Sequence, residues 1–419
     1  MALAGRFRGG RPMAALLAGI LMLGACADGG EGTALLRWYV FDEPSGAFLE
    51  AARSCSEESS GAYRYEVELV PLPADANQQR EQLVRRLAAG DSDIDIIGMD
   101  VIWTAEFAEA RWILPWPEER AGEVISGRLP ASRESVRYED RVWGAPFTTN
   151  AQLLWYRTDR VERPPDTWEE MIGMAEALGD SGTIQAQGER YEGLTVFFVS
   201  LLASAGGSVL EDGEVSLDAD PTREALEVMH RFATSPASDP SLARAREDQA
   251  RLAFESGRST FMVNYTYVWA SARENVPELA EKMGWARWPG VQEGRPSRVT
   301  VGGINLGVGA YSRHPDLAFR AVACLSSEKH QRLVAARGGL PPTTASLYQE
   351  EEIRSTFPFA DLLVETLRDA VQRPKTPLYT DVSLAISRTL HPMSGILPEK
   401  DLAELRNAVG RALRSEGLF

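Results

Sequence analysis

Short apolar runs alternate with segments of helical periodicity in the first part of the chain. The predicted strands are residues 35–40, 65–70 and 95–99, and the predicted helices between them are residues 47–56 and 78–89. The third run is apolar between acidic residues, which is typical of a strand buried on both faces. This alternation of strand and helix predicts an α/β fold whose parallel sheet is covered by helices.

Asp100 stands where the third strand ends and a helical pattern begins. Ligands of open α/β sheets bind outside the carboxyl ends of the strands, so Asp100 is a candidate ligand-binding residue. Aspartate is also a favoured helix N-cap, and the local pattern fits either role.

The pattern changes twice in the rest of the chain. Glycine and proline interrupt residues 142–150 and 338–342, and segments of this kind suit crossings between domains. A strand is expected at 151–156, mostly helix over 167–257, including one helix over 242–256, and another strand at 260–264. Residues 299–308 are strand-like but carry glycines, which often mark a close approach by ligand or backbone. The remainder is predicted to be mostly helical.

The N-terminus has the organisation of an export signal. Arg6, Arg8 and Arg11 precede an apolar stretch over 13–23, which is shorter than the roughly 20 residues of a membrane-spanning helix. The motif LGAC that ends at Cys26 resembles the lipobox of bacterial lipoproteins. We therefore expect a signal peptide over 1–25, a lipidated Cys26 and a flexible tether over 26–34. The alternative is an ordinary secretory signal with a chance cysteine.

Charge and motifs exclude several functions. The formal charge of −16 becomes −19 once residues 1–25 are removed, which disfavours nucleic acid as a partner. The sequence contains no G-x-S-x-G, Walker A or H-E-x-x-H motif, and its four histidines are scattered. We therefore expect no metal, no cofactor and no catalytic residue. Paired carboxylates such as Asp42 and Asp100 leave a glycoside hydrolase as the alternative class.

Cys55 and Cys324 remain once Cys26 is lipidated. Export permits a disulfide between them, and the helix that holds Cys324 could pack beside the helix of Cys55. The alternative is a pair of buried free thiols.

Several strings carry a family resemblance. FESGRSTFMVN at 254–264 and VGGINL at 301–306 resemble the carbohydrate-binding group of extracellular solute-binding proteins of ABC importers, which includes the maltose-binding protein. Four further strings resemble the trehalose-binding lipoproteins of actinobacterial importers more narrowly. These are MDVIWTAEFA at 99–108, TTNAQLLWY at 148–156, GGLP at 338–341 and RPKTPLY at 373–379. Both cysteines align with this resemblance. The segment between Val276 and Val299 is shorter than in those proteins.

The resemblance implies a two-lobed, type II periplasmic-binding-protein-like fold with a ligand cleft between lobes joined by three crossovers. We expect these crossovers near residues 146–150, 264–265 and 338–342. The N-terminal lobe is then residues 35–147 with 265–340, and the C-terminal lobe is residues 148–264 with 341–419. The implied partners are a disaccharide, the membrane subunits of an ABC permease and the membrane itself through the lipid anchor. We expect a monomer on the outer face of the cell membrane.

A sugar offers many hydroxyls, so its site needs planar polar side chains and aromatic platforms. The strand-end rule suggests one of Asp42 and Glu43, together with Asp100, and the resemblance supports Asp100 and Asn150. The other expected residues come from the second half of the cleft and from the glycine-rich strand. They are Phe198, Tyr265, Tyr267, Gly302, Gly303 and Arg373. Trp103 could be either cleft wall or core. The predicted function is capture of a disaccharide, trehalose or a related α-glucoside, with another oligosaccharide as the alternative ligand.

Overall fold

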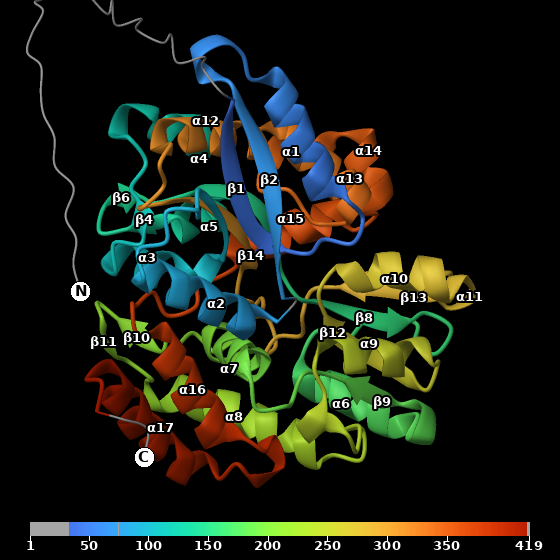
Figure 1. Cartoon of the computed structure of the whole chain (residues 1–419). Helices are drawn as coiled ribbons and strands as arrows, with labels where there is room; N and C mark the ends of the chain where they lie inside the picture. The colour runs from blue at the N-terminus through green and yellow to red at the C-terminus, as the bar shows by residue number, and fades with distance from the viewer. Residues whose placement is uncertain (1–32, 74, 417–419) are drawn as a thin grey trace, which may run out of the picture. The chain divides into compact units, whose positions relative to one another are not determined.

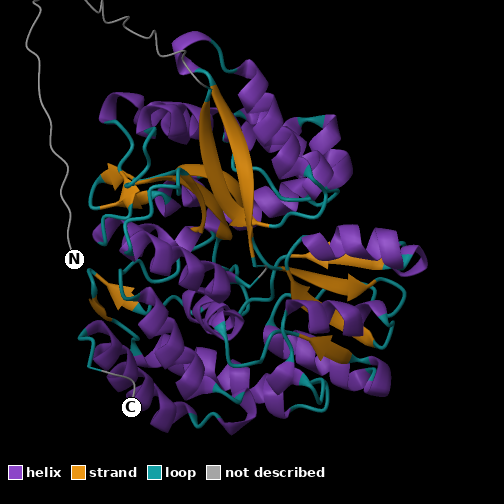
Figure 2. Ribbon diagram, viewed as in Figure 1, coloured by secondary structure: helices purple, strands orange, loops and turns teal. Residues whose placement is uncertain are grey.

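The computed structural model describes residues 33–73 and 75–416, which hold two separate main sheets (Figures 1 and 2). The first has the strand order β2-β1-β3-β14-β4, with β7 also paired to β14. Its strands are β1 (Ala34–Phe41), β2 (Tyr65–Leu72), β3 (Ile96–Asp100), β4 (Ile113–Leu114), β7 (Ala145–Asn150) and β14 (Gly302–Gly309). β1 is parallel to β2 and β3, as the sequence predicts, whereas β14 runs antiparallel to β3 and β7.

Helices cover both faces of this first sheet. On one face, Trp38 of β1 packs against Phe48 and Phe147 with ring centroids 5.3 and 5.8 Å apart. On the other face, Met99 of β3 packs in a cluster with Phe107. The helices of this region are α1 (Ala47–Glu58), α2 (Ala76–Ala88), α3 (Thr104–Glu109), α4 (Ala121–Ile125), α5 (Pro130–Ser135), α12 (Pro315–Leu325) and α13 (Glu328–Gly338).

The second sheet has the order β13-β8-β12-β9. Its strands are β8 (Leu153–Arg157), β9 (Thr183–Gln185), β12 (Ser259–Asn264) and β13 (Met283–Ala286). β8 is antiparallel to both of its neighbours. Two small hairpins complete the strands, β5 (Arg137–Tyr138) with β6 (Arg141–Val142) and β10 (Leu210–Glu211) with β11 (Glu214–Val215).

A large apolar core belongs to this second region. The apolar helix α7 (Glu192–Ser204) lies within it and is buried from Gly193 onward. The other helices are α6 (Trp168–Ala177), α8 (Ala219–Thr234), α9 (Glu247–Glu255), α10 (Tyr267–Asn275), α11 (Pro277–Ala280), α16 (Tyr379–Leu390) and α17 (Pro398–Leu413). Two further helices adjoin the first region, since α14 (Glu351–Thr356) packs beside α13 and α15 (Ala360–Asp369) contacts α5 (Figure 1). The expected helix at 242–256 is instead a short 3-10 turn over Leu242–Arg244 followed by α9.

One expected crossing is wrong. Residues 265–301 stay with the second sheet, because β13 pairs with β8 and because Val268, Ala272 and Trp288 are buried in the second core. The chain returns to the first sheet only at β14, so this crossing lies at Val301–Gly302 and not at 264–265. β13 completes its backbone hydrogen bonds on β8, and the apolar positions of α10 are buried in the second core.

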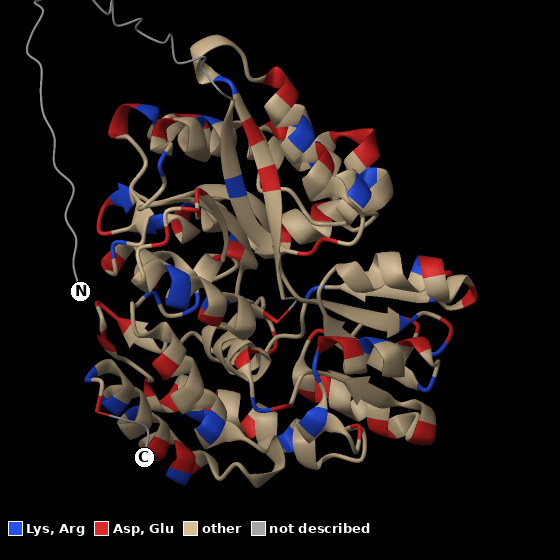
Figure 3. Cartoon of the chain, in the orientation of Figure 1, with Lys and Arg blue, Asp and Glu red and all other residues tan. Residues whose placement is uncertain are grey.

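The Cys55–Cys324 disulfide is present, and its Cα atoms are 5.9 Å apart. It joins α1 to α12 on one face of the first sheet. The expected signal peptide and Cys26 lie outside the described residues. Within the two described ranges, no helix is long and apolar enough to span a bilayer. Acidic and basic residues lie mainly on the outer helices (Figure 3).

Candidate functional site

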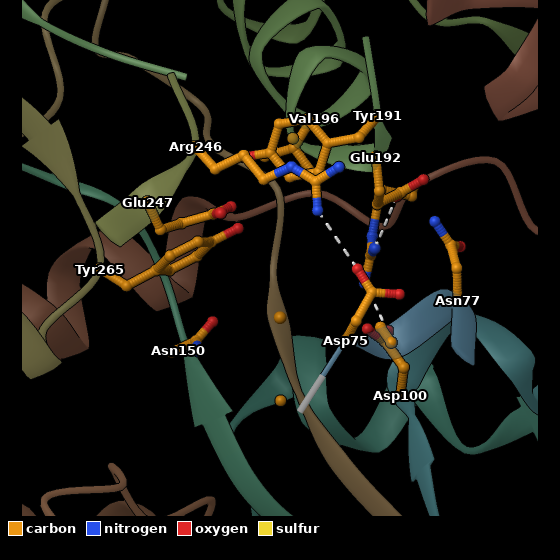
Figure 4. Close-up of a pocket in the computed structure, with 15 residues that line it drawn as sticks. Asp75, Asn77, Asp100, Asn150, Tyr191, Glu192, Val196, Arg246, Glu247 and Tyr265 are labelled. Atoms are coloured by element: carbon orange, nitrogen blue, oxygen red, sulfur yellow. Dashed lines mark hydrogen bonds and ion pairs between the residues drawn. The ribbon is translucent and has the colours of Figure 1, made fainter. Parts of the chain in front are cut away.

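A cavity of about 310 Å³ lies between the ends of the strands of the first sheet and the second region (Figure 4). Its lining residues come from both sides. They are Asp75, Ala76, Asn77, Asp100, Asn150, Tyr191, Glu192, Gly193, Val196, Arg246, Glu247, Tyr265, Gly302, Gly303 and Arg373.

The strand register explains why the first side converges on one place. Gly302 of β14 is opposite Asn150, the last residue of β7, and Ile304 is opposite Asp100, the last residue of β3. Since β14 runs antiparallel to both strands, its start lies beside both of their carboxyl ends. Three segments far apart in sequence therefore bring their polar ends to the same wall of the cavity.

The two positions at the start of β14 have no room for a side chain, so both must be glycine. A Cβ on Gly302 would lie 2.4 Å from the Asn150 Oδ1, and one on Gly303 would lie 2.2 Å from the Thr148 carbonyl oxygen. Gly303 also has a φ of +132°, which side chains rarely adopt. The cavity wall here is therefore bare backbone.

Asp100 takes both of the roles that its sequence position suggested. Its Oδ1 accepts a hydrogen bond from the Ile102 backbone N–H at 3.1 Å, which is a capping contact. The same oxygen accepts a hydrogen bond from Arg373 Nη2 at 2.7 Å, which joins the first sheet to the segment before α16.

Arg373 is held on its other side by Glu192, the first residue of α7. Arg373 Nη1 lies 2.8 Å from the Glu192 Oε1, and Glu192 also accepts hydrogen bonds from the Tyr379 and Ser383 hydroxyls. The Arg373 side chain is 5 % exposed, and the two carboxylates raise the pKa of its guanidinium against the effect of burial. Arg373 is thus a buried cation fixed between two acids.

A second ion pair crosses the cavity near α2. Arg246 Nη1 lies 3.3 Å from the Oδ2 of Asp75, which also caps α2 through the Gln78 N–H. Arg246 uses its Nε and Nη2 on Glu189, at 2.7 and 2.8 Å, and its guanidinium lies 4.7 Å from the Tyr191 ring centroid.

Glu247 begins α9 and faces the cavity with Tyr265 and Tyr191 (Figure 4). Burial raises the pKa of the Glu247 carboxyl, and nearby Arg246 only partly offsets this effect. Burial likewise raises the pKa of the Tyr265 hydroxyl above its ordinary value, and the Glu247 charge adds to that shift.

Three residues that line the cavity each carry a buried polar atom without a well-formed hydrogen bond to the described residues. These atoms are the Asn150 Oδ1, the Tyr191 hydroxyl, which lies near the Glu247 carboxylate, and the Arg373 Nε. An unpaired buried polar atom costs roughly 1–3 kcal/mol, so a bound ligand that pairs with them would recover that energy. This set includes both acceptors and donors, which suits a ligand rich in hydroxyls.

The structure brings together six of the ten ligand-binding residues predicted from the sequence. They are Asp100, Asn150, Tyr265, Gly302, Gly303 and Arg373. The other four lie outside this cavity.

Glu43 and Asp42 lie outside for different reasons. The Glu43 carboxylate accepts hydrogen bonds from the backbone N–H groups of Ser45 and Ala47, both at 2.8 Å, so it caps the start of α1. Asp42 is exposed. Both residues belong to the turn after β1, and neither lines the cavity.

Phe198 and Tyr267, also predicted to bind the ligand, do not line the cavity either. Phe198 is fully buried in the second core, because α7 is apolar on every side and presents only its first turns to the cavity. Tyr267 is the first residue of α10, and its hydroxyl donates to Asp248 at 3.1 Å instead of facing the cavity.

The sequence interpretation missed nine lining residues, which lie in loops and in the first turns of helices. They are Asp75, Ala76, Asn77, Tyr191, Glu192, Gly193, Val196, Arg246 and Glu247. Trp103, for which the sequence allowed either a core or a cleft-wall position, has both roles. It is 5 % exposed, stacks on Phe107 and lines a second cavity of about 510 Å³ that shares Asp100 and Arg373 with the first.

The chain matches the family model described as bacterial extracellular solute-binding protein over residues 62–332. It belongs to this family. The match covers strands of both sheets and most of the elements that build the cavity.

Similar proteins agree with this assignment. This solute-binding protein is 27 % identical to a probable ABC transporter-binding protein of Deinococcus radiodurans, over 78 % of this chain and 81 % of that one. It is 24 % identical to a mannitol-binding protein of Pseudomonas aeruginosa, over 70 % of each chain. A solved structure of maltose-bound MalE3 from T. maritima superposes with a TM-score of 0.81 at 26 % identity, covering 90 % of this chain and 99 % of that one.

These matches establish the two-lobed α/β fold. They also show that the solute-binding protein is not an enzyme, because the family and the relatives are binding proteins. The hydrolase alternative is therefore excluded.

Proposed function

We propose that this protein is the sugar-capturing subunit of an ABC importer, held to the cell membrane by a lipid on Cys26. The ligand is a disaccharide, trehalose or a related α-glucoside, that binds in the cavity between the lobes. Lobe closure captures it, and the closed form delivers it to the membrane subunits of a permease.

The observation that carries this proposal is the set of unpaired polar atoms around a cavity of disaccharide size. Asn150, Tyr191 and Arg373 offer buried donors and acceptors, and Tyr265 offers an aromatic ring for a C–H face of a sugar. The relatives support a polyhydroxyl ligand, since they are described as maltose-bound, mannitol-binding and diacetylchitobiose-binding proteins. Trehalose itself rests on the resemblance of the strings around Asp100, Asn150 and Arg373.

The ion pairs across the cavity support the closure mechanism. Arg373–Asp100 and Arg246–Asp75 each connect an element of the first region to an element of the second. Both pairs form only when the two regions approach, so they favour the closed form once a ligand fills the space between them.

A thermal-shift screen of the protein from Ala27 onward tests this function. Trehalose, maltose, other α-glucosides and mannitol are each added at 1 mM and above. A ligand at 100 times its Kd adds about 2.7 kcal/mol to the unfolding free energy, which is a clear rise in Tm. A flat response to every sugar contradicts the proposal, and a response to mannitol alone contradicts the disaccharide.

A further inference from the structure

The cavity has an excess of acidic groups. Its lining includes the carboxylates of Asp75, Asp100, Glu192 and Glu247, but its only guanidinium groups among the described lining residues are those of Arg246 and Arg373. The lining is therefore formally acidic, and what matters for a charged ligand is which of these groups remain available.

Both arginines already form ion pairs with carboxylates of the protein. Arg246 divides its three nitrogens between Glu189 and Asp75. Arg373 places one terminal nitrogen on Glu192 and the other on Asp100, which leaves only its Nε without a partner. A phosphate or carboxylate on a ligand would have to break one of these ion pairs to reach a terminal guanidinium nitrogen.

Glu247 is the acid that lacks such a partner. None of the ion pairs formed by the described residues includes Glu247, whereas Asp75, Asp100 and Glu192 each pair with an arginine. Its neighbours across the cavity are the uncharged hydroxyls of Tyr191 and Tyr265, and neither hydroxyl supplies a countercharge. Figure 4 shows Glu247 and Tyr265 directed into the space that the pocket occupies.

We propose that Glu247 gives this site a charge preference: it admits neutral sugars, favours a cationic amino sugar whose ammonium contacts the Glu247 carboxylate, and rejects anionic sugars such as sugar phosphates and uronates. This inference rests on the proposed function, because it takes the ligand to be a sugar. It adds the charge class of the ligand and names the residue that selects it.

Two physical effects act together. The ammonium of an amino sugar supplies the missing countercharge of a half-buried carboxylate, and a charge-assisted hydrogen bond is stronger than a neutral one. An anionic group instead meets a like charge that Arg246, already paired with Glu189 and Asp75, offsets only in part. The space is partly desolvated, and Coulomb interactions there are several times stronger than in water. The difference in affinity between the two classes is expected to be roughly a hundredfold.

The test is calorimetric titration at pH 7 with trehalose, trehalose 6-phosphate, and trehalose derivatives that carry one amino group at position 2, 4 or 6. Each is titrated into the wild type, Glu247→Gln and Asp248→Asn. Gln keeps the shape of the side chain and removes its charge. Asp248 is the exposed neighbour outside the cavity, so Asp248→Asn controls for a change of nearby surface charge.

We expect at least one amino derivative to bind the wild type about tenfold more tightly than trehalose, and this advantage to disappear in Glu247→Gln but not in Asp248→Asn. Trehalose 6-phosphate should bind the wild type at least tenfold more weakly than trehalose and should regain affinity in Glu247→Gln. Circular dichroism confirms that each variant is folded.

Two results overturn the inference while the proposed function stands. One is trehalose 6-phosphate binding the wild type as tightly as trehalose, and the other is an amino-sugar advantage that survives in Glu247→Gln. If neither trehalose nor any derivative binds the wild type, the proposed trehalose-class function fails and this inference fails with it.

Discussion

Arg373 Nη2 lies 2.7 Å from the Oδ1 of Asp100, and this contact joins the end of β3 to the segment before α16. The two residues are 273 positions apart in sequence. Because Glu192 holds the other side of the guanidinium, the contact places a buried cation at a fixed position on the cavity wall.

This geometry predicts that Arg373→Lys weakens ligand binding. Lysine keeps the charge but has a single ammonium, which cannot span two carboxylates in the way a planar guanidinium does. We expect a loss of about 2 kcal/mol or more in binding free energy, measured by calorimetry. The matched control is Arg368→Lys, at an exposed position of α15, which should bind as the wild type does. Equal affinity in both variants would remove Arg373 from the site.

The Arg246–Asp75 pair should contribute little to stability. The two side chains are 39 % and 33 % exposed, and exposed ion pairs are screened by water and salt. A double-mutant cycle with Arg246→Ala and Asp75→Ala, read by denaturant unfolding, should give a coupling energy of about 0.5 kcal/mol. The coupling should fall further in 1 M NaCl. A coupling energy above about 2 kcal/mol would mean that the ion pair contributes substantially to stability and would contradict this prediction.

Glu247 predicts a pH dependence. Burial raises the pKa of this carboxyl, so the folded state binds its proton more tightly than the unfolded state does. The contribution of Glu247 to stability is therefore fully present below the ordinary carboxyl pKa and is lost as pH rises through the raised one. Glu247→Gln removes this loss, and without ligand it should melt roughly 2 °C above the wild type at pH 7.5, with a smaller gain at pH 4. A gain that is larger at pH 4 would reverse the sign and contradict this account.

The disulfide should matter for stability and not for binding. It joins α1 to α12, and neither Cys55 nor Cys324 lines the cavity. Replacing both cysteines by alanine is expected to cost about 2–4 kcal/mol of unfolding free energy while leaving the Kd for ligand unchanged. A change of more than about threefold in Kd would contradict this prediction and would show that ligand binding depends on the disulfide.

The sequence predicted the first sheet well because its signals are local. β1 and β3 are short, largely apolar runs, β2 alternates apolar and polar residues at period two, and the strand-end rule led from β3 to Asp100. The resemblance then supplied Asn150 and Arg373, which no local pattern connects to Asp100. The antiparallel placement of β14 between β3 and β7, which gathers these residues, is a long-range pairing that periodicity cannot show.

Two of the missed lining residues are the first residues of helices, where an acidic side chain does not by itself indicate ligand binding. Glu192 and Glu247 are acidic first residues of α7 and α9, and an acid at that position is ordinary helix chemistry. The predicted helix over 242–256 ran through Glu247 and concealed the true start of α9. The prediction for Phe198 had a different weakness. An aromatic residue suggested a platform for a sugar ring, but α7 is buried in the core from Gly193 onward.

Calorimetric titration of trehalose into the wild type and into Asp100→Ala tests the central claim most directly. The account predicts one site per chain with a micromolar or lower Kd in the wild type. In the folded variant it predicts a loss of several kcal/mol, because truncation removes an acid from the cavity and leaves Arg373 with a single partner. Unchanged binding by Asp100→Ala, or no binding of any α-glucoside by the wild type, would contradict the claim that this cavity holds the sugar.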